Sequence, residues 1–113
     1  MPEPVLLAQL DDLVHRGRVR LDRAEREALA HALAEIPCQS LELFGSRVAT
    51  GSRGGDIDVL VLTSEPAFQT ARRITTRFFS RCEERIDAVV IDPESASAAE
   101  ADFLARLTRV PLF

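Results

Sequence analysis

The chain has 113 residues, a formal net charge of −4 and 46% apolar residues, a balance typical of one globular domain. It has no apolar run near the roughly 20 residues that span a bilayer, and its first residues lack the basic segment of a secretory signal. We therefore expect a cytoplasmic protein without a membrane partner. The negative charge argues against a nucleic-acid partner. Cys38 and Cys82 match no metal-ligand spacing and are expected to be reduced, buried thiols.

Two helices are predicted ahead of the first strand. Apolar residues recur at helical spacing from Val5 to Val14, and Gly17 interrupts the pattern. Asp22, followed three residues later by Glu25, forms a capping-box pattern at the start of a second helix. That helix is expected to end before Pro37.

Three apolar segments predict the strands. Residues 41–44 are expected to form a short strand, which ends at a loop over 45–55 with four glycines and three Ser or Thr residues. Residues 57–62 are a nearly continuous apolar run rich in Val, Ile and Leu, which is typical of a strand that is covered on both faces. Residues 86–91 are predicted as a further strand.

Two more helices complete the order of elements. One is predicted from Pro66 to about Glu84, and a last one covers 98–108 with Ser95 or Ser97 as its cap. The order predicts an α/β (α+β) fold, a small mixed β-sheet of three or more strands with helices packed on it.

The helix between the last two strands carries two patterns of its own. Its arginine series is interpreted as a solvated face: Arg72, Arg73, Arg77, Arg81 and Arg85. Its large apolar residues are interpreted as core or interface rather than a platform for stacking bases: Ile74, Phe78 and Phe79.

A pair of carboxylates opens the second strand. Because side chains alternate along a strand, Asp56 and Asp58 are expected to point the same way, about 7 Å apart along the chain. Two carboxylates at about 4 Å repel by roughly 4 kcal/mol at an effective dielectric near 20, so a cation or a retained proton is expected between them. Asp58 and Asp87 are each followed by four apolar residues, which brings Asp87 beside the pair if the two strands are neighbours at the same level.

Oxygen-only ligands favour Mg²⁺ or Mn²⁺ over Zn²⁺. Two such ions can activate a hydroxyl and stabilise a pyrophosphate leaving group. The loop before the carboxylates fits the same chemistry. Gly45 allows close approach of the backbone to a ligand, and the N–H and hydroxyl of Ser46 can hold phosphate oxygens. Arg47 and, as a second candidate, Arg53 can add positive charge.

This combination resembles the minimal nucleotidyltransferases (MNT), a family of the DNA polymerase-β-type nucleotidyltransferase superfamily. The shared pattern is a Gly-Ser pair, a spacer and three acids, here Gly45-Ser46, nine residues, Asp56-Ile57-Asp58 and Asp87. The resemblance covers residues 41–91. Gly55 stands where many relatives have Ser or another polar residue, which we interpret as a mild departure.

The resemblance implies a nucleotidyltransferase fold, Mg²⁺ with Mn²⁺ as an alternative, and ATP as the substrate. Gly45 and Ser46 would hold the β- and γ-phosphates, with Arg47 as a further nucleotide-binding residue. Asp56 and Asp58 would bind both metal ions. Asp87 would bind the catalytic metal and help to activate the acceptor hydroxyl.

One nucleotidyltransferase domain is expected over 1–113, with N-terminal helices in 1–36, the catalytic core in 41–91 and a C-terminal helix in 96–113. So small a chain would enclose the nucleotide base poorly. We therefore expect a partner protein or a second copy to complete the site, docked on the first helix or on residues 110–113.

The family resemblance also suggests a biological role. MNT proteins are commonly the antitoxin of a prokaryotic toxin–antitoxin module whose toxin is a helical HEPN-domain protein, and some members adenylylate a tyrosine of that toxin. The chain itself has no Tyr, so the acceptor would lie in another molecule. The expected activity is transfer of AMP from ATP to a partner's hydroxyl. The alternatives are a non-catalytic module that neutralises its HEPN partner by binding, or nucleotidyl transfer to a small molecule or RNA.

Overall fold

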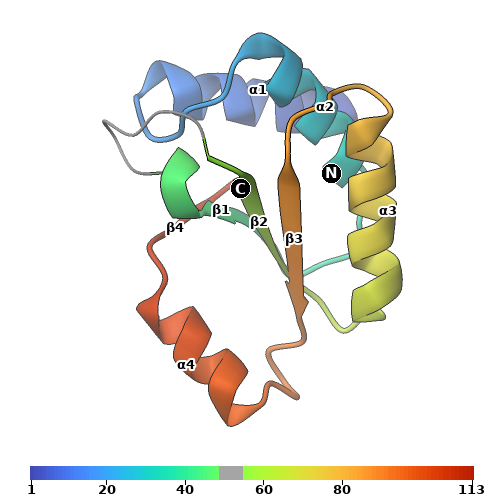
Figure 1. The fold of residues 1–113 in the computed structure, drawn as a ribbon, viewed down its shortest axis with the longest axis vertical. Helices are drawn as coiled ribbons and strands as arrows, with labels where there is room; N and C mark the ends of the chain where they lie inside the picture. Colours follow the sequence, from blue (N-terminus) through green and yellow to red (C-terminus); the bar gives the residue numbers. More distant parts are fainter. Residues whose placement is uncertain (49–54) are drawn as a thin grey trace.

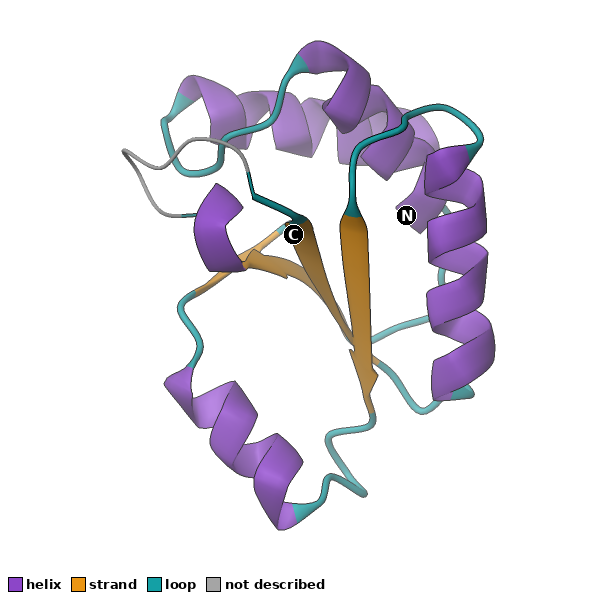
Figure 2. Cartoon of the chain, viewed as in Figure 1, coloured by secondary structure: helices purple, strands orange, loops and turns teal. Residues whose placement is uncertain are grey.

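The fold is organised around a mixed four-stranded sheet (Figure 2). The computed structural model describes residues 1–48 and 55–113. In these residues the strands are β1 (Ser40–Phe44), β2 (Ile57–Leu62), β3 (Ile86–Ile91) and β4 (Arg109–Pro111). They lie in the order β3-β2-β1-β4. Strand β1 runs antiparallel to both β2 and β4, while β2 and β3 are parallel.

The helices divide unequally between the two faces of the sheet (Figure 1). They are α1 (Glu3–His15), α2 (Arg23–Leu33), the short 3₁₀ helix η1 (Gly45–Arg47), α3 (Ala67–Phe79) and α4 (Ala98–Arg106). Helices α1, α2 and α3 contribute to the main hydrophobic core on one face. Helix α4 stands apart from them and packs on the other face.

Side chains along β2 point alternately to the two faces of the sheet, which explains why an apolar cluster lies on each face. Ile57, Val59 and Val61 point to the main core and are fully buried. Leu60 points the opposite way, where it packs with Phe44 and the partly buried apolar side of α4. Both faces of the strand are thus covered over most of its length, as the nearly continuous apolar sequence predicts.

The predicted fold class is confirmed, and the mixed sheet with packed helices is consistent with a nucleotidyltransferase-like α+β fold. Strands 57–62 and 86–91 have the predicted bounds. The helix predicted to reach Glu84 ends at Phe79. The predicted capping box of Asp22 and Glu25 is present.

Strand β4 is the main element that the sequence analysis missed. Residues 110–113 were expected to offer a partner surface, but Val110 and Leu112 are buried. Val110 is the register partner of Leu43 in β1, and the N–H of Leu112 donates to the carbonyl of Leu41. The prediction of an exposed C-terminal docking segment is therefore wrong for these two residues, whereas Pro111 and Phe113 are exposed.

Two smaller findings concern the membrane and the thiols. Within the described part of the chain, no helix combines the length and apolar character of a membrane span. Cys38 and Cys82 are free and only partly buried, where full burial was expected. Burial raises the pKa of the Cys38 thiol.

Candidate active site

Two of the predicted carboxylates meet on neighbouring strands. Asp58 in β2 and Asp87 in β3 are register partners of a parallel pair. Cross-strand partners lie on one face of a sheet, with strands roughly 4.8 Å apart. Asp56 precedes β2 by one residue and is exposed. The charges of Asp87 and Asp56 both contribute to the raised pKa of Asp58, after the effect of burial, so both carboxylates lie near Asp58 at this end of the sheet.

The turn that begins at Gly45 lies directly beside the carboxylate of Asp58. Strand β1 ends at Phe44, the register partner of Asp58, and Gly45 follows with a φ of 76°. A Cβ on Gly45 would collide with Oδ2 of Asp58. Any side chain here would therefore displace the carboxylate, and the left-handed backbone adds a second reason for glycine. The turn and the acidic pair share one edge of the sheet.

Ser46 lies against Gly55 at the other end of the loop. A Cβ on Gly55 would collide with the Ser46 hydroxyl oxygen, and Gly55 has a φ of 86°. The interpretation of Gly55 as a mild departure is therefore wrong, because a serine here would be strained and would press on Ser46. The Ser46 hydroxyl therefore lies close to the residue that precedes Asp56.

Arg47 has a different environment from the predicted one. Its side chain is 5% exposed and donates two hydrogen bonds to the Glu25 carboxylate, at 2.9 and 2.8 Å. The same guanidinium donates to the carbonyls of Arg20 and Gly55, each at 3.1 Å. A guanidinium so engaged is not free to bind phosphate, so we correct its role to that of a positioning residue. Arg53, the second candidate cation, lies outside the described residues.

The Glu25–Arg47 pair ties η1 to helix α2. Burial alone would raise the pKa of Glu25, but the hydrogen bonds that its carboxylate accepts from Arg47 and from the backbone N–H of Asp22, together with nearby arginine charges, outweigh burial and lower the pKa. The hydrogen bonds that Arg47 donates to Glu25 raise the pKa of Arg47 against the effect of burial. Both groups are therefore charged at neutral pH, and the turn that begins at Gly45 is anchored by a buried ion pair.

Burial and like charge both act on Asp58. Partial burial raises the pKa of its carboxyl, and the carboxylates of Asp87 and Asp56 raise it further. The ionised form of Asp58 is thus disfavoured unless a cation compensates. That is the electrostatic condition of a cation site, and the carboxylate-only donor set fits Mg²⁺ or Mn²⁺.

The three acids are near one another without forming a finished cage. Among residues 1–48 and 55–113, no three His, Cys, Asp or Glu side chains converge closely enough to enclose a metal ion. Asp58 and Asp87 share the register, whereas exposed Asp56 stands just outside β2. The fit to a divalent ion rests on the carboxylate donors and on the raised pKa of Asp58, whose ionised form is disfavoured without a cation.

Comparison of the chain with models of known protein families and with curated proteins finds no match. The chemistry of this site must therefore follow from its own residues.

Strand β4 adds a residue that the sequence analysis missed. Arg109 is the register partner of Phe44, so Arg109, Phe44, Asp58 and Asp87 form one row across the sheet. The Nε of Arg109 lies 3.5 Å from the carboxylate of buried Glu42, and its Nη1 is buried without a hydrogen-bond partner in the described residues. No local signal marks this row, because the pairing of β4 with β1 is decided in three dimensions.

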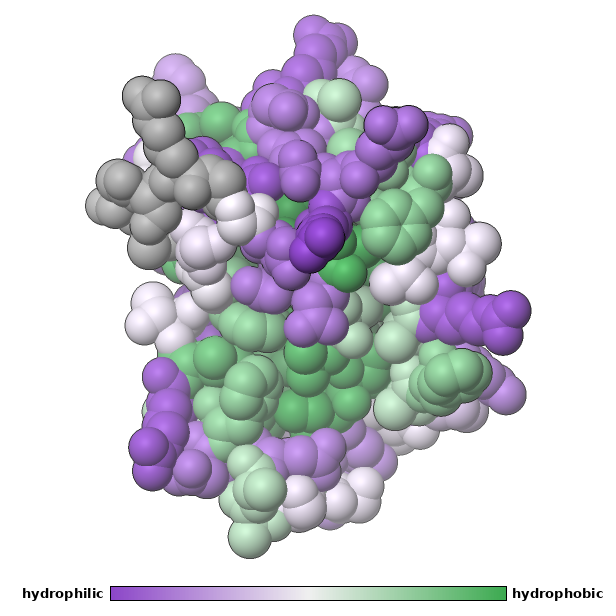
Figure 3. Space-filling view, in the orientation of Figure 1, coloured by the Kyte–Doolittle hydropathy of each residue, from purple (hydrophilic) through white to green (hydrophobic). Residues whose placement is uncertain are grey.

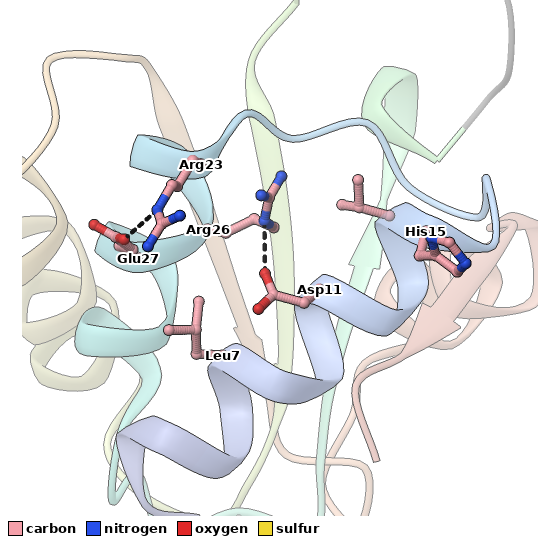
Figure 4. A pocket seen from close by; sticks show the side chains of 7 residues that line it. Leu7, Asp11, His15, Arg23, Arg26 and Glu27 are labelled. Atoms are coloured by element: carbon pink, nitrogen blue, oxygen red, sulfur yellow. Dashed lines mark hydrogen bonds and ion pairs between the residues drawn. The ribbon is translucent and has the colours of Figure 1, made fainter.

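Two cavities flank the turn and the helical layer. One of about 340 Å³ adjoins the turn and is lined by Gly45, Val48, Arg106, Leu107 and Thr108. Another of about 320 Å³ lies between α1 and α2 (Figure 4). Its charged side chains pair with one another, Arg26 with Asp11 at 2.8 Å and Arg23 with Glu27 at 2.9 Å. Its described lining contains none of the predicted site residues, and we assign the chemistry to the sheet edge.

Proposed function

We propose that this chain is a Mg²⁺-dependent nucleotidyltransferase of the MNT type, which transfers AMP from ATP to a hydroxyl of a partner protein. The observation that carries the proposal is the contact of Gly45 with Asp58, whose register partner is Asp87. A turn suited to phosphate thus adjoins paired carboxylates suited to a divalent ion.

The residues take distinct roles in this reaction. Asp56, Asp58 and Asp87 would hold Mg²⁺, which supplies compensation for the negative charge of the triphosphate. The backbone and hydroxyl of Ser46 bind phosphate oxygens. The acceptor oxygen bonds to the α-phosphorus as the bond to the β-phosphate breaks. Pyrophosphate leaves, and Asp87 accepts the proton of the acceptor hydroxyl.

The proposed partner is a helical HEPN-domain protein, with this chain as the antitoxin of the pair. The chain lacks Tyr, so a tyrosine acceptor would be in trans. A homodimer that completes the site is the other arrangement. The reaction uses ATP and Mg²⁺, and we propose the cytoplasm as its location.

A second candidate function is neutralisation of the partner by binding alone. Transfer to a small molecule or to an RNA end is the remaining alternative, and the same assay can include those acceptors.

The test is incubation of the chain with Mg²⁺, ATP radiolabelled at the α-phosphate and a helical HEPN-domain protein as the proposed partner. We expect label on the partner, none without Mg²⁺, and loss of at least about 100-fold in rate for Asp56→Ala/Asp58→Ala. A stable complex without labelling would contradict catalysis and support binding alone.

A control variant separates the site from general charge effects. Asp11→Ala/Asp12→Ala removes the same two charges from exposed positions of α1. It should keep wild-type labelling. Equal loss of labelling in both double variants would contradict the assignment of the carboxylates.

A further inference from the structure

Helix α3 exposes two aromatic side chains on one side. Phe68 is 75% exposed and Phe79 is 52% exposed. They are 11 residues apart in one helix, which is close to three turns, so they lie on the same side at a separation of roughly 16 Å. The opposite side of α3, with Ile74 and Phe78, is buried in the core. Figure 3 shows apolar surface near both ends of α3 with hydrophilic side chains between.

The exposed aromatic at the end of α3 is held in place. The ring of Phe79 contacts that of fully buried Phe78 edge to face, with centroids 5.9 Å apart. A partner that covers Phe79 therefore loses little by ordering it. Rigid, exposed aromatic side chains of this kind are typical anchors of protein interfaces.

All charged residues of the same helix are arginines. Ala67–Phe79 contains three Arg and no Asp or Glu, in a chain whose net charge is −4. Arg77 donates to the carbonyl of Ala34 at 3.2 Å. Within the described residues, Arg72 and Arg73 have no ion-pair partner. Arg72 lies between the two exposed phenylalanines by helical spacing, at four residues from Phe68 and seven from Phe79.

We propose that the α3 outer face, formed by Phe68, Arg72 and Phe79, docks an acidic amphipathic helix of a protein partner. A helix laid along α3 can contact both rings over three turns, as one ridge of side chains packs beside another. Acidic residues that flank its apolar positions would pair with the unpaired arginines. The inference rests on the proposed function only for the identity of that partner.

Other occupants fit the face less well. A second copy docked face to face would bring Arg72 against Arg72, which repels. RNA would meet two unpaired arginines on a chain of net negative charge, a weak electrostatic footprint. Helix α3 also covers the sheet face opposite to α4, so a partner docked there leaves the row of Asp58 and Asp87 uncovered.

The test measures binding of the full chain to the helical HEPN-domain protein used in the labelling assay, by calorimetry at two salt concentrations. We expect Phe68→Ala/Phe79→Ala to weaken the complex roughly 30-fold or more. Arg72→Glu should weaken it about tenfold at low salt and reduce its salt dependence. Circular dichroism should show unchanged helix content, since all three side chains are exposed.

Matched controls come from the same chain. Phe113→Ala removes a ring that is 51% exposed at the C-terminus, and Arg18→Glu reverses an exposed charge between α1 and α2. Both should bind like wild type. Wild-type binding by the α3 variants, with labelling retained, would overturn this inference alone. No complex with the wild-type chain would overturn both this inference and the proposed partner.

Two further outcomes would also overturn the inference. Self-association in sedimentation that Phe68→Ala/Phe79→Ala abolishes would make the α3 outer face an interface between copies. Gel-shift assays with single-stranded RNA would point to RNA if binding is lost in the same variants and kept in Phe113→Ala.

Discussion

At the scale of single residues, Asp58 has close neighbours on both sides. Gly45, which directly follows β1, leaves no room for a side chain beside the Asp58 carboxylate, and Asp87 is the register partner of Asp58 on β3. Burial, then Asp87 and Asp56, raise its pKa. A group held in this way costs folding free energy when ionised, because its charge lacks a compensating cation. Such a cost is typical of a functional site rather than of a structural one.

In the Arg47–Glu25 pair, by contrast, the charge of each buried side chain is compensated by the charge of the other. We predict that Arg47→Met destabilises the fold by about 3 kcal/mol, because it leaves the Glu25 carboxylate buried and unpaired. The Arg47→Met/Glu25→Gln double variant should recover part of that loss. Urea unfolding at pH 7 measures both, and equal stability of wild type and Arg47→Met would contradict an anchoring role.

The same pair predicts a pH dependence. The pKa of Glu25 is lowered in the folded state from its ordinary value of 4.5, so the carboxylate contributes stability above that pH and loses it as the pH falls further. We expect thermal unfolding of wild type to show a steeper loss of stability below about pH 4.5 than Glu25→Gln. Parallel pH profiles for the two proteins would argue against the ion pair.

At the scale of elements, β4 closes the sheet and fixes the end of the chain. Leu112 follows it and is fully buried in the main core, while its neighbour Phe113 is exposed. We predict that Leu112→Ala costs about 2–4 kcal/mol in the free energy of unfolding, whereas Phe113→Ala costs less than about 0.5 kcal/mol. Urea unfolding of the two variants provides the comparison. Similar costs would mean that the C-terminal segment is not packed as described.

The elements differ in how far the sequence predicted them. Strands 57–62 and 86–91 follow from continuous apolar runs, and the start of α2 follows from the Asp22–Glu25 capping box. Strand β4 has only three residues, one of which is Pro111. So short a segment has no periodicity of its own and is a strand only because it pairs with β1.

At the scale of the whole molecule, ligand binding and folding should be linked. We predict that Mg²⁺ and ATP together raise the Tm of the wild-type chain by roughly 5–10 °C at about 100 times the Kd. Asp58→Asn should lose this shift, because the carboxylate that faces Gly45 is gone. Phe68→Ala/Phe79→Ala should keep it, since α3 covers the opposite face. Differential scanning calorimetry gives all three values, and no shift in wild type would contradict nucleotide binding.

The candidate site was predictable only in part, for reasons that concern distance along the chain. Asp56, Asp58 and Asp87 could be grouped because each lies at the start of an apolar run, where parallel neighbours bring such ends together. Arg47 was placed wrongly because its partner, Glu25, is 22 residues away in another helix. Nothing local distinguishes an arginine that will bind phosphate from one that will be buried against a carboxylate.

The sequence by itself determined the fold class, the bounds of β2 and β3, and the position of the acids at the start of those strands. Local spacing and apolar periodicity suffice for these features. Only the tertiary structure decided the pairing of β4, the burial of Arg47, the need for glycine at Gly55 and the exposed side of α3. Each of those depends on contacts between segments far apart in the chain, where packing and charge, rather than local propensity, determine the outcome.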